Sequence, residues 1–235
     1  MKVIKTYALL VAIVACTRDR AATSDVNSAK AQTSSSGAPA AAPASRLQAP
    51  ASRPTILFIG TSLTAGYGLD ADSAYPLQIQ RMIDSASLPY TVVNVGVSGE
   101  TSSALVRRLD WLMRQPYAVA VVETGANDGL RGIPVETMES NIEQILTRLH
   151  ASRPEARIAL IQMEAPPNLG SAYTQRFRAV FPEVASRTGS TLLPFLLQDV
   201  AGRRELNQAD GMHPNYEGER RVARNVWKGL RPMLQ

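Results

Sequence analysis

Apolar runs alternate with amphipathic segments along the chain from residue 54 onward. Five of the runs are rich in β-branched residues and are predicted strands: TILFIG (55–60), YTVVNVGV (90–97), AVAVVETG (118–125), RIALIQME (157–164) and STLLPF (190–195). Helical spacing predicts helices between and after them, at 75–87, 102–114, 135–152, 173–188 and 216–233. Apolar strands separated by helices are typical of a parallel sheet that is covered on both faces. The pattern therefore predicts an α/β domain over 54–235, a three-layer α/β/α sandwich with a five-stranded parallel sheet.

The first 53 residues have a different character. MKVIKTYALLVAIVAC has a short positive start and then about ten mostly apolar residues, which is too short to span a bilayer and is typical of a signal peptide over 1–15. The ending IVAC resembles the lipobox of bacterial lipoproteins and predicts lipidation of Cys16. Alternatively, Cys16 is incidental to an ordinary cleavage site and the protein is secreted. Residues 16–53 are rich in Ala, Ser, Pro and Thr, which predicts a flexible linker.

Composition narrows the possible partners. With 235 residues and 45% hydrophobic content, the chain can bury the core of one ordinary domain. The formal charge of +5 is modest, and basic residues are scattered among acidic ones. Because no basic stripe with interleaved aromatics occurs, nucleic acid is not expected as a partner. The single cysteine excludes an intrachain disulfide, and we expect a monomer.

Polar and glycine-rich segments follow the first three predicted strands, where ligands bind in open α/β sheets. They are GTSLT (60–64), SGET (98–101) and GAND (125–128), and ADGMHPN (209–215) comes before the last helix. This set suits acyl transfer, in which a base activates a serine, a carboxylate orients the base, and N–H groups stabilise an oxyanion. Each segment also has a plainer interpretation. Gly99 fits a turn, Asn127 and Asp128 fit caps before the next helix, and Asp210 fits a turn before a helix.

The two histidines differ in position. His150 lies near the end of the helix predicted over 135–152, where an imidazole stabilises the last turn, so we expect a structural role. His213 lies in a loop three residues after Asp210, and this spacing allows both side chains to face one pocket.

The chain from residue 55 onward resembles the SGNH, or GDSL, hydrolase family, and within it the group of arylesterases, thioesterase I and lysophospholipases. The resemblance rests on four blocks in order: FIGTSLTAGYGL, NVGVSGETSSALVRRL, VVETGANDGLRG and DGMHPN. It implies a catalytic triad of Ser62, His213 and Asp210. It also implies an oxyanion hole made by the backbone N–H groups of Ser62 and Gly99 and the side chain of Asn127. No metal or cofactor is implied.

One position departs from the family pattern. Where the family has Gly-Asp-Ser-Leu, this chain has Gly-Thr-Ser-Leu, with Thr61 in place of the aspartate. The resemblance implies that this aspartate helps hold the nucleophile loop by hydrogen bonds. Thr61 keeps an acceptor oxygen but lacks the charge.

The predicted function is hydrolysis of carboxylic esters, including thioesters and lysophospholipids, with small-molecule esters or lipids as substrates. The segment EAPPNLGS (164–171) is expected to border the substrate pocket. The predicted location is the bacterial cell envelope, in the periplasm, with a membrane anchor through lipidated Cys16.

Three alternatives stay open. The first is a flavodoxin-like module in which GTSLT wraps the phosphate of a flavin or nucleotide, although the chain lacks the P-loop lysine and the G-x-G-x-x-G fingerprint. The second is a carbohydrate acetylesterase. The third is a lipoprotein with an impaired triad that binds acyl chains or glycans.

Overall fold

The structure of this chain is a computed structural model that describes residues 53–235. The predicted signal peptide (1–15) and Cys16 lie outside the described residues. The predicted linker (16–53) also lies outside them, apart from its last residue. These three assignments stay predictions.

A five-stranded parallel sheet forms the centre of the domain, as the sequence predicts. Its strands, in spatial order, are β2 (Thr91–Asn94), β1 (Thr55–Ile59), β3 (Val119–Val122), β4 (Arg157–Ile161) and β5 (Thr191–Leu193). The three central strands are buried almost throughout, whereas β2 and β5 each expose residues. The expectation of strands apolar on both faces therefore holds for the centre and is wrong for the edges, which are covered less completely.

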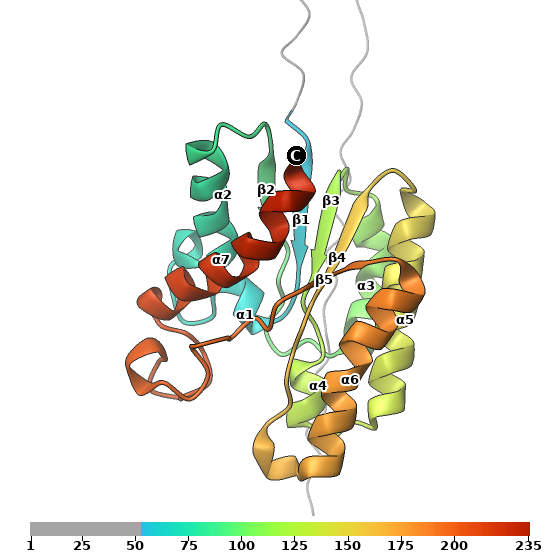
Figure 1. Ribbon diagram of the computed structural model, residues 1–235, viewed down its shortest axis with the longest axis vertical. Helices are drawn as coiled ribbons and strands as arrows, with labels where there is room; N and C mark the ends of the chain where they lie inside the picture. Colours follow the sequence, from blue (N-terminus) through green and yellow to red (C-terminus); the bar gives the residue numbers. More distant parts are fainter. Residues whose placement is uncertain (1–52) are drawn as a thin grey trace, which may run out of the picture. The chain divides into compact units, whose positions relative to one another are not determined.

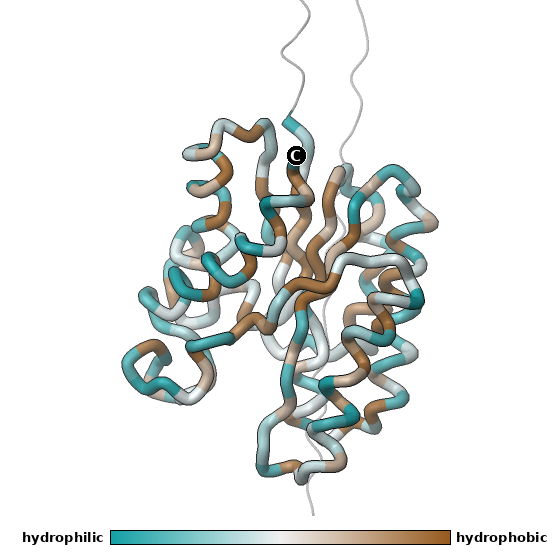
Figure 2. Tube along the Cα trace, viewed as in Figure 1, coloured by the Kyte–Doolittle hydropathy of each residue, from teal (hydrophilic) through white to brown (hydrophobic). Residues whose placement is uncertain are grey.

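Helices cover the sheet on both faces (Figure 1). One face carries α2 (Tyr75–Ser85) and α7 (Tyr216–Leu230), and the other carries α3 (Ser102–Met113), α5 (Val135–Ser152) and α6 (Ser171–Thr188). The apolar side chains predicted to share one face of α5 are all fully buried: Met138, Ile142, Ile145, Leu146 and Leu149. Figure 2 shows apolar residues along the strands and polar residues on the outer sides of the helices.

The last helix ends earlier than the sequence predicts. It stops at Leu230, and a 3-10 turn follows over Arg231–Leu234. Pro232 explains the change, because proline lacks the N–H group that would continue the α-helical ladder. Three further 3-10 turns are Ala71–Ser73, Pro167–Leu169 and Arg204–Leu206. No helix among the described residues has the length and apolar character to cross a membrane.

Two short helices occupy segments that the sequence suggested were loops. They are α1 (Ser62–Ala65), which starts three residues after β1 ends, and α4 (Ala126–Leu130), which follows β3. Gly66 ends α1 and Gly125 precedes α4, and both glycines have left-handed backbones. These helices set Ser62 and Asn127 at the carboxyl edge of the sheet.

Candidate active site

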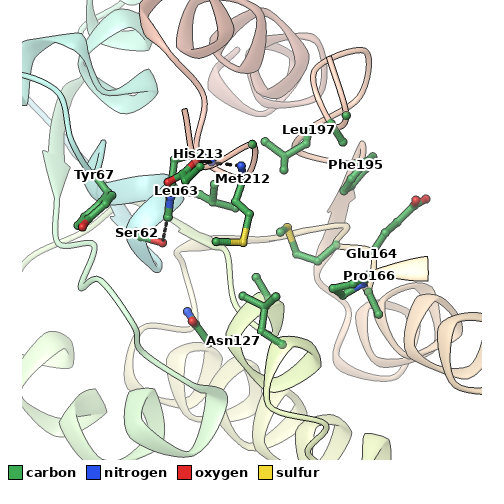
Figure 3. Close-up of a pocket in the computed structure, with 18 of the residues that line it drawn as sticks. Ser62, Leu63, Tyr67, Asn127, Glu164, Pro166, Phe195, Leu197, Met212 and His213 are labelled. Atoms are coloured by element: carbon green, nitrogen blue, oxygen red, sulfur yellow. Dashed lines mark hydrogen bonds and ion pairs between the residues drawn. The ribbon is translucent and has the colours of Figure 1, made fainter. Parts of the chain in front are cut away.

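Ser62, His213 and Asp210 form one continuous hydrogen-bonded line (Figure 3). His213 Nε2 lies 2.9 Å from Ser62 Oγ, and His213 Nδ1 lies 2.7 Å from Asp210 Oδ2. An ionised carboxylate can only accept hydrogen bonds, so Nδ1 carries the proton and Nε2 is free to accept from the serine hydroxyl. The structure thus brings together the three side chains that the sequence predicts as a triad.

The loop that carries Asp210 is shaped by that residue itself. Asp210 Oδ1 accepts the backbone N–H groups of Met212 at 2.9 Å and of His213 at 3.0 Å. These bonds, together with the contact to the imidazole, lower the pKa of Asp210 to about 2. The carboxyl is therefore ionised at all but the most acidic pH, as an orienting group for histidine must be.

Two side chains hold the His213 loop against the nucleophile segment. The ring of Tyr67 packs against the imidazole of His213, with 4.7 Å between the ring centroids. The amide nitrogen of Gln208 donates to the carbonyl of Tyr67 at 2.7 Å and to the carbonyl of Pro214 at 3.0 Å. Neither residue was singled out from the sequence, because their roles depend on a contact between segments about 140 residues apart.

The predicted oxyanion donors lie around Ser62. Ser62 is the first residue of α1, and Gly99 has a left-handed backbone with φ of 77°. Their backbone N–H groups have no acceptor among the described residues. Asn127 donates one amide hydrogen to the carbonyl of Glu100 at 3.0 Å, which fixes the side chain and leaves its second hydrogen free. Ser62, Gly99 and Asn127 all line the same cavity.

Asp128 caps a helix, but not the one the sequence suggested. Its two carboxylate oxygens accept the backbone N–H of Ser102 at 2.9 Å and the hydroxyl of Ser102 at 2.6 Å. Ser102 is the first residue of α3, which precedes Asp128 in the chain. The expectation of a cap before the next helix is therefore wrong, because α4 folds back to bring this carboxylate to the start of α3.

Thr61, which replaces the family aspartate, acts as a donor. Its backbone N–H donates to Glu123 Oε2 at 2.7 Å, and its hydroxyl lies 3.0 Å from both carboxylate oxygens of Glu123. The acceptor oxygen that Thr61 keeps is therefore not what the structure uses, since the hydroxyl donates to Glu123. Glu123 was missed at the sequence level, although a carboxylate within the apolar run AVAVVETG was a signal.

A cavity of about 660 Å³ opens beside the triad. Its walls are mostly apolar, and they include Leu63, Leu130, Met163, Phe195, Leu197 and Met212. Glu164, Ala165, Pro166 and Pro167 also line it, as expected for the segment 164–171. Figure 3 shows Ser62 and His213 at one end of the cavity and Glu164, Pro166 and Phe195 at the other.

His150 does not belong to this site. It lies in α5, and its Nε2 is 3.1 Å from the hydroxyl of Ser190. Burial lowers the pKa of His150, which favours the neutral imidazole. These contacts agree with the structural role expected from the sequence.

Comparison with known proteins identifies the family. The GDSL-like Lipase/Acylhydrolase family matches residues 58–221. The chain belongs to this family. Esterase TesA of Pseudomonas aeruginosa is 34% identical over 181 residues, which cover 77% of this chain and 89% of TesA. Thioesterase 1/protease 1/lysophospholipase L1 of Escherichia coli is 35% identical over 181 residues, covering 77% and 85%. An arylesterase of Vibrio mimicus is 31% identical over 176 residues, covering 74% and 87%.

Solved structures agree with this assignment. The crystal structure of TesA matches with a TM-score of 0.73 and 34% identity over 77% of this chain and 99% of that one. The esterase EstA from Pseudoalteromonas, in a structure inhibited by monoethylphosphonate, matches with a TM-score of 0.72 and 34% identity, covering 77% and 98%. This GDSL-like hydrolase is therefore a serine ester hydrolase that acts on small-molecule esters. The flavin- or nucleotide-binding alternative is not favoured.

Proposed function

We propose that Ser62 is the nucleophile of this hydrolase, with His213 as general base and Asp210 as the residue that orients His213. Ser62 Oγ attacks the ester carbonyl carbon while its proton passes to His213 Nε2. The protonated imidazole then gives that proton to the leaving alcohol, and an acyl-enzyme remains. Water, deprotonated by the same imidazole, releases the acid and restores Ser62. The observation that carries this proposal is the 2.9 Å contact between Ser62 Oγ and His213 Nε2.

The oxyanion of each tetrahedral intermediate is bound by the N–H groups of Ser62 and Gly99 and by the free amide hydrogen of Asn127. This role is supported because the backbone N–H groups of Ser62 and Gly99 have no other acceptor among the described residues. Donors that are held in place before the reaction stabilise the developing charge without reorganisation. The bond from Asn127 to the Glu100 carbonyl supplies that fixed orientation.

The preferred substrates are carboxylic esters with an apolar acyl chain of short to medium length. The apolar side chains around the cavity favour hydrocarbon over sugar, which places acetylated carbohydrates second. The names of the relatives, which include an esterase, an arylesterase and a thioesterase/lysophospholipase, fit the same bond type. Thioesters of coenzyme A are scarce outside the cytoplasm, so lysophospholipids and other oxygen esters are the more suitable substrates.

The enzyme works in the bacterial cell envelope, tethered by a lipid on Cys16 and by the linker over 16–53. This part of the proposal rests on the sequence of the first 53 residues, with its apolar run before Cys16. All groups assigned to catalysis come from one chain, so the proposed mechanism needs no partner subunit.

Hydrolysis of p-nitrophenyl esters tests the proposal. We expect the full chain to be active and Ser62→Ala and His213→Ala to lose at least about 1000-fold in kcat. Ser186→Ala, an exposed serine in α6, and His150→Ala serve as matched controls and keep full activity. Activity in Ser62→Ala comparable to the parent contradicts the assignment of the nucleophile.

A further inference from the structure

A fully buried carboxylate accepts hydrogen bonds from residues on both sides of Ser62. Glu123 follows β3 directly and is 0% exposed. It accepts the backbone N–H of Thr61 at 2.7 Å and the hydroxyl of Thr61 at 3.0 Å. It also accepts the hydroxyl of Thr64 at 2.9 Å. Three donors, from positions one before and two after Ser62, thus converge on one group.

Besides Glu123, hydrogen bonds to two backbone carbonyls hold the turn that presents Ser62. The Val97 N–H donates to the carbonyl of Gly60 at 2.8 Å, and the Asn94 side-chain amide donates to the carbonyl of Thr64 at 2.8 Å. Helix α1 has only four residues, too few to be stable by itself, and Thr61 at its N-cap position makes no side-chain capping bond. The Thr61 hydroxyl is donated to Glu123 instead. Packing here is close, because a Cβ atom added to Gly60 would lie 2.0 Å from Thr64 Oγ1 and 2.6 Å from Glu123 Oε2.

Burying the carboxyl of Glu123 costs desolvation free energy that packing alone does not require. The donors that reach it are a backbone amide and two hydroxyls, all neutral. Burial raises the pKa of Glu123, and the hydrogen bonds from Thr61 and Thr64 oppose that rise. An apolar side chain of similar size would fill the same space without the desolvation cost. A buried carboxyl beside a reacting group is typical of a functional requirement.

A second layer supports the same carboxylate. Thr64 Oγ1 lies 3.0 Å from the hydroxyl of Tyr75, which is 1% exposed and starts α2. Since Thr64 gives its hydrogen to Glu123, the Tyr75 hydroxyl donates to Thr64. The nucleophile turn is therefore linked from β3 through Glu123 and Thr64 to α2.

We infer that Glu123 is a positioning residue for the nucleophile, and that the hydroxyl of Thr61 is the contact through which it acts. This inference rests on the proposed role of Ser62. An aspartate at position 61 would place a second carboxyl near Glu123, and like charges disfavour the ionisation of both groups. Threonine instead supplies a donor to a single carboxylate. The threonine that stands in place of the family aspartate therefore has a defined partner, Glu123, for both its backbone N–H and its hydroxyl.

The test replaces buried hydroxyls one at a time in the full chain and measures kcat and KM on a p-nitrophenyl ester. Thr61→Val is nearly isosteric and removes one bond to Glu123, and we expect kcat to fall roughly 10- to 100-fold with KM little changed. Thr61→Ser restores the hydroxyl and most of the activity. Thr124→Val is the matched control, because the Thr124 hydroxyl is buried next to Glu123 and has no hydrogen-bond partner among the described residues. It keeps the kcat of the parent.

A wild-type kcat in Thr61→Val overturns the inference, and so does an equal loss in Thr61→Val and Thr124→Val. If Thr61→Val fails to fold, Thr61→Ala gives the same test, because it also removes the hydroxyl that Glu123 accepts. Thr61→Ala is then expected to lose kcat with KM little changed, and a parent-like kcat contradicts the inference. Ser62→Ala separates the two proposals. An active Ser62→Ala removes the proposed function, whereas an inactive Ser62→Ala beside a fully active Thr61→Val removes only the role of Glu123.

Discussion

His213 Nε2 lies 2.9 Å from Ser62 Oγ, although the two residues are 151 positions apart in the chain. Ser62 starts the short helix after β1, and His213 lies in the loop before α7. The contact closes only when the first strand and the last helix are both packed on the sheet. The proposed mechanism of this hydrolase therefore needs the complete fold.

Asp210 supports His213 in two ways that two substitutions separate. Asp210→Asn keeps an oxygen to accept the N–H groups of Met212 and His213, but its amide N–H faces Nδ1 and favours the wrong tautomer. We expect kcat to fall about 1000-fold or more with the melting temperature little changed. Asp210→Ala also loses the loop bonds, and we expect a lower melting temperature as well. Equal activity in Asp210→Asn and the parent contradicts this account.

Gly99 has a left-handed backbone that a side chain resists. A Cβ atom there has room, since its nearest neighbour is Arg131 Nη2 at 3.9 Å, so strain and not a clash is the expected effect of Gly99→Ala. The strain, about 1 to 3 kcal/mol, is relieved by turning the peptide and its N–H away from the oxyanion. We expect kcat to fall roughly 100-fold with KM little changed.

Gly189→Ala is the control for this prediction. Gly189 ends α6 with φ of 68°, and an added Cβ atom meets nothing within 4 Å. It should lose comparable stability in thermal unfolding while keeping kcat. Similar kcat losses in the two variants would show that strain alone, and not the oxyanion donor, explains the effect.

Glu219 is a buried carboxyl that ties stability to pH. It is 1% exposed and accepts the backbone N–H of Tyr75 at 2.7 Å. Burial raises the pKa of Glu219 to about 8, from an ordinary value of 4.5. The folded state binds this proton more tightly than the unfolded chain does. The contribution of Glu219 to stability is therefore complete below pH 4.5 and is lost as the pH rises through about 8.

Urea unfolding at several pH values in this window measures the effect. The free energy of unfolding should fall as the pH rises between the unfolded and the folded pKa of Glu219, with a slope on the order of 1.4 kcal/mol per pH unit. Glu219→Gln removes the ionisable group and should flatten this part of the profile. Glu217→Gln, an exposed residue of the same helix, should leave the slope in place. An unchanged slope in Glu219→Gln assigns the pH dependence to another group.

Leu130 lines the cavity and is 54% exposed in the free enzyme, so a bound acyl chain can cover it. Leu130→Ala removes apolar contact area, and we expect kcat/KM for an octanoyl ester to fall about tenfold. The acetyl ester, whose acyl group is too short to reach along the cavity, should change little. Leu192→Ala is the control, because Leu192 is 38% exposed and is not part of the cavity wall. Equal losses on both esters contradict a role in chain binding.

Much of the fold was predictable because its signals are local. The apolar runs and the helical spacing in α5 each arise within a few residues of sequence, and the structure keeps both. The helices α1 and α4 were missed because four or five residues are too few to show a period. Such short helices form where tertiary contacts hold them, and those contacts come from residues that are distant in the sequence.

The residues of the candidate site also fall into two groups, those with a local sequence signal and those that depend on tertiary contacts. The sequence singled out Ser62, Asp210 and His213 because each lies in a compact sequence block, and the structure brings the three side chains together. The partnership of Thr61 and Glu123 was not found, because the two residues are 62 positions apart and meet only when β1 and β3 pair in the sheet. The apolar lining of the cavity could not be predicted either, because Leu130, Phe195 and Met212 come from three separate segments.

The central claim is that Ser62 forms a covalent intermediate under activation by His213. The direct test treats the full chain with a p-nitrophenyl phosphonate, whose phosphorus accepts the serine oxygen and releases nitrophenolate. Intact mass and peptide mapping then locate the adduct. We predict one phosphonyl group, on Ser62, with labelling that is abolished in Ser62→Ala and slowed strongly in His213→Ala. A stable adduct on another residue, or equally fast labelling of His213→Ala, would contradict the account.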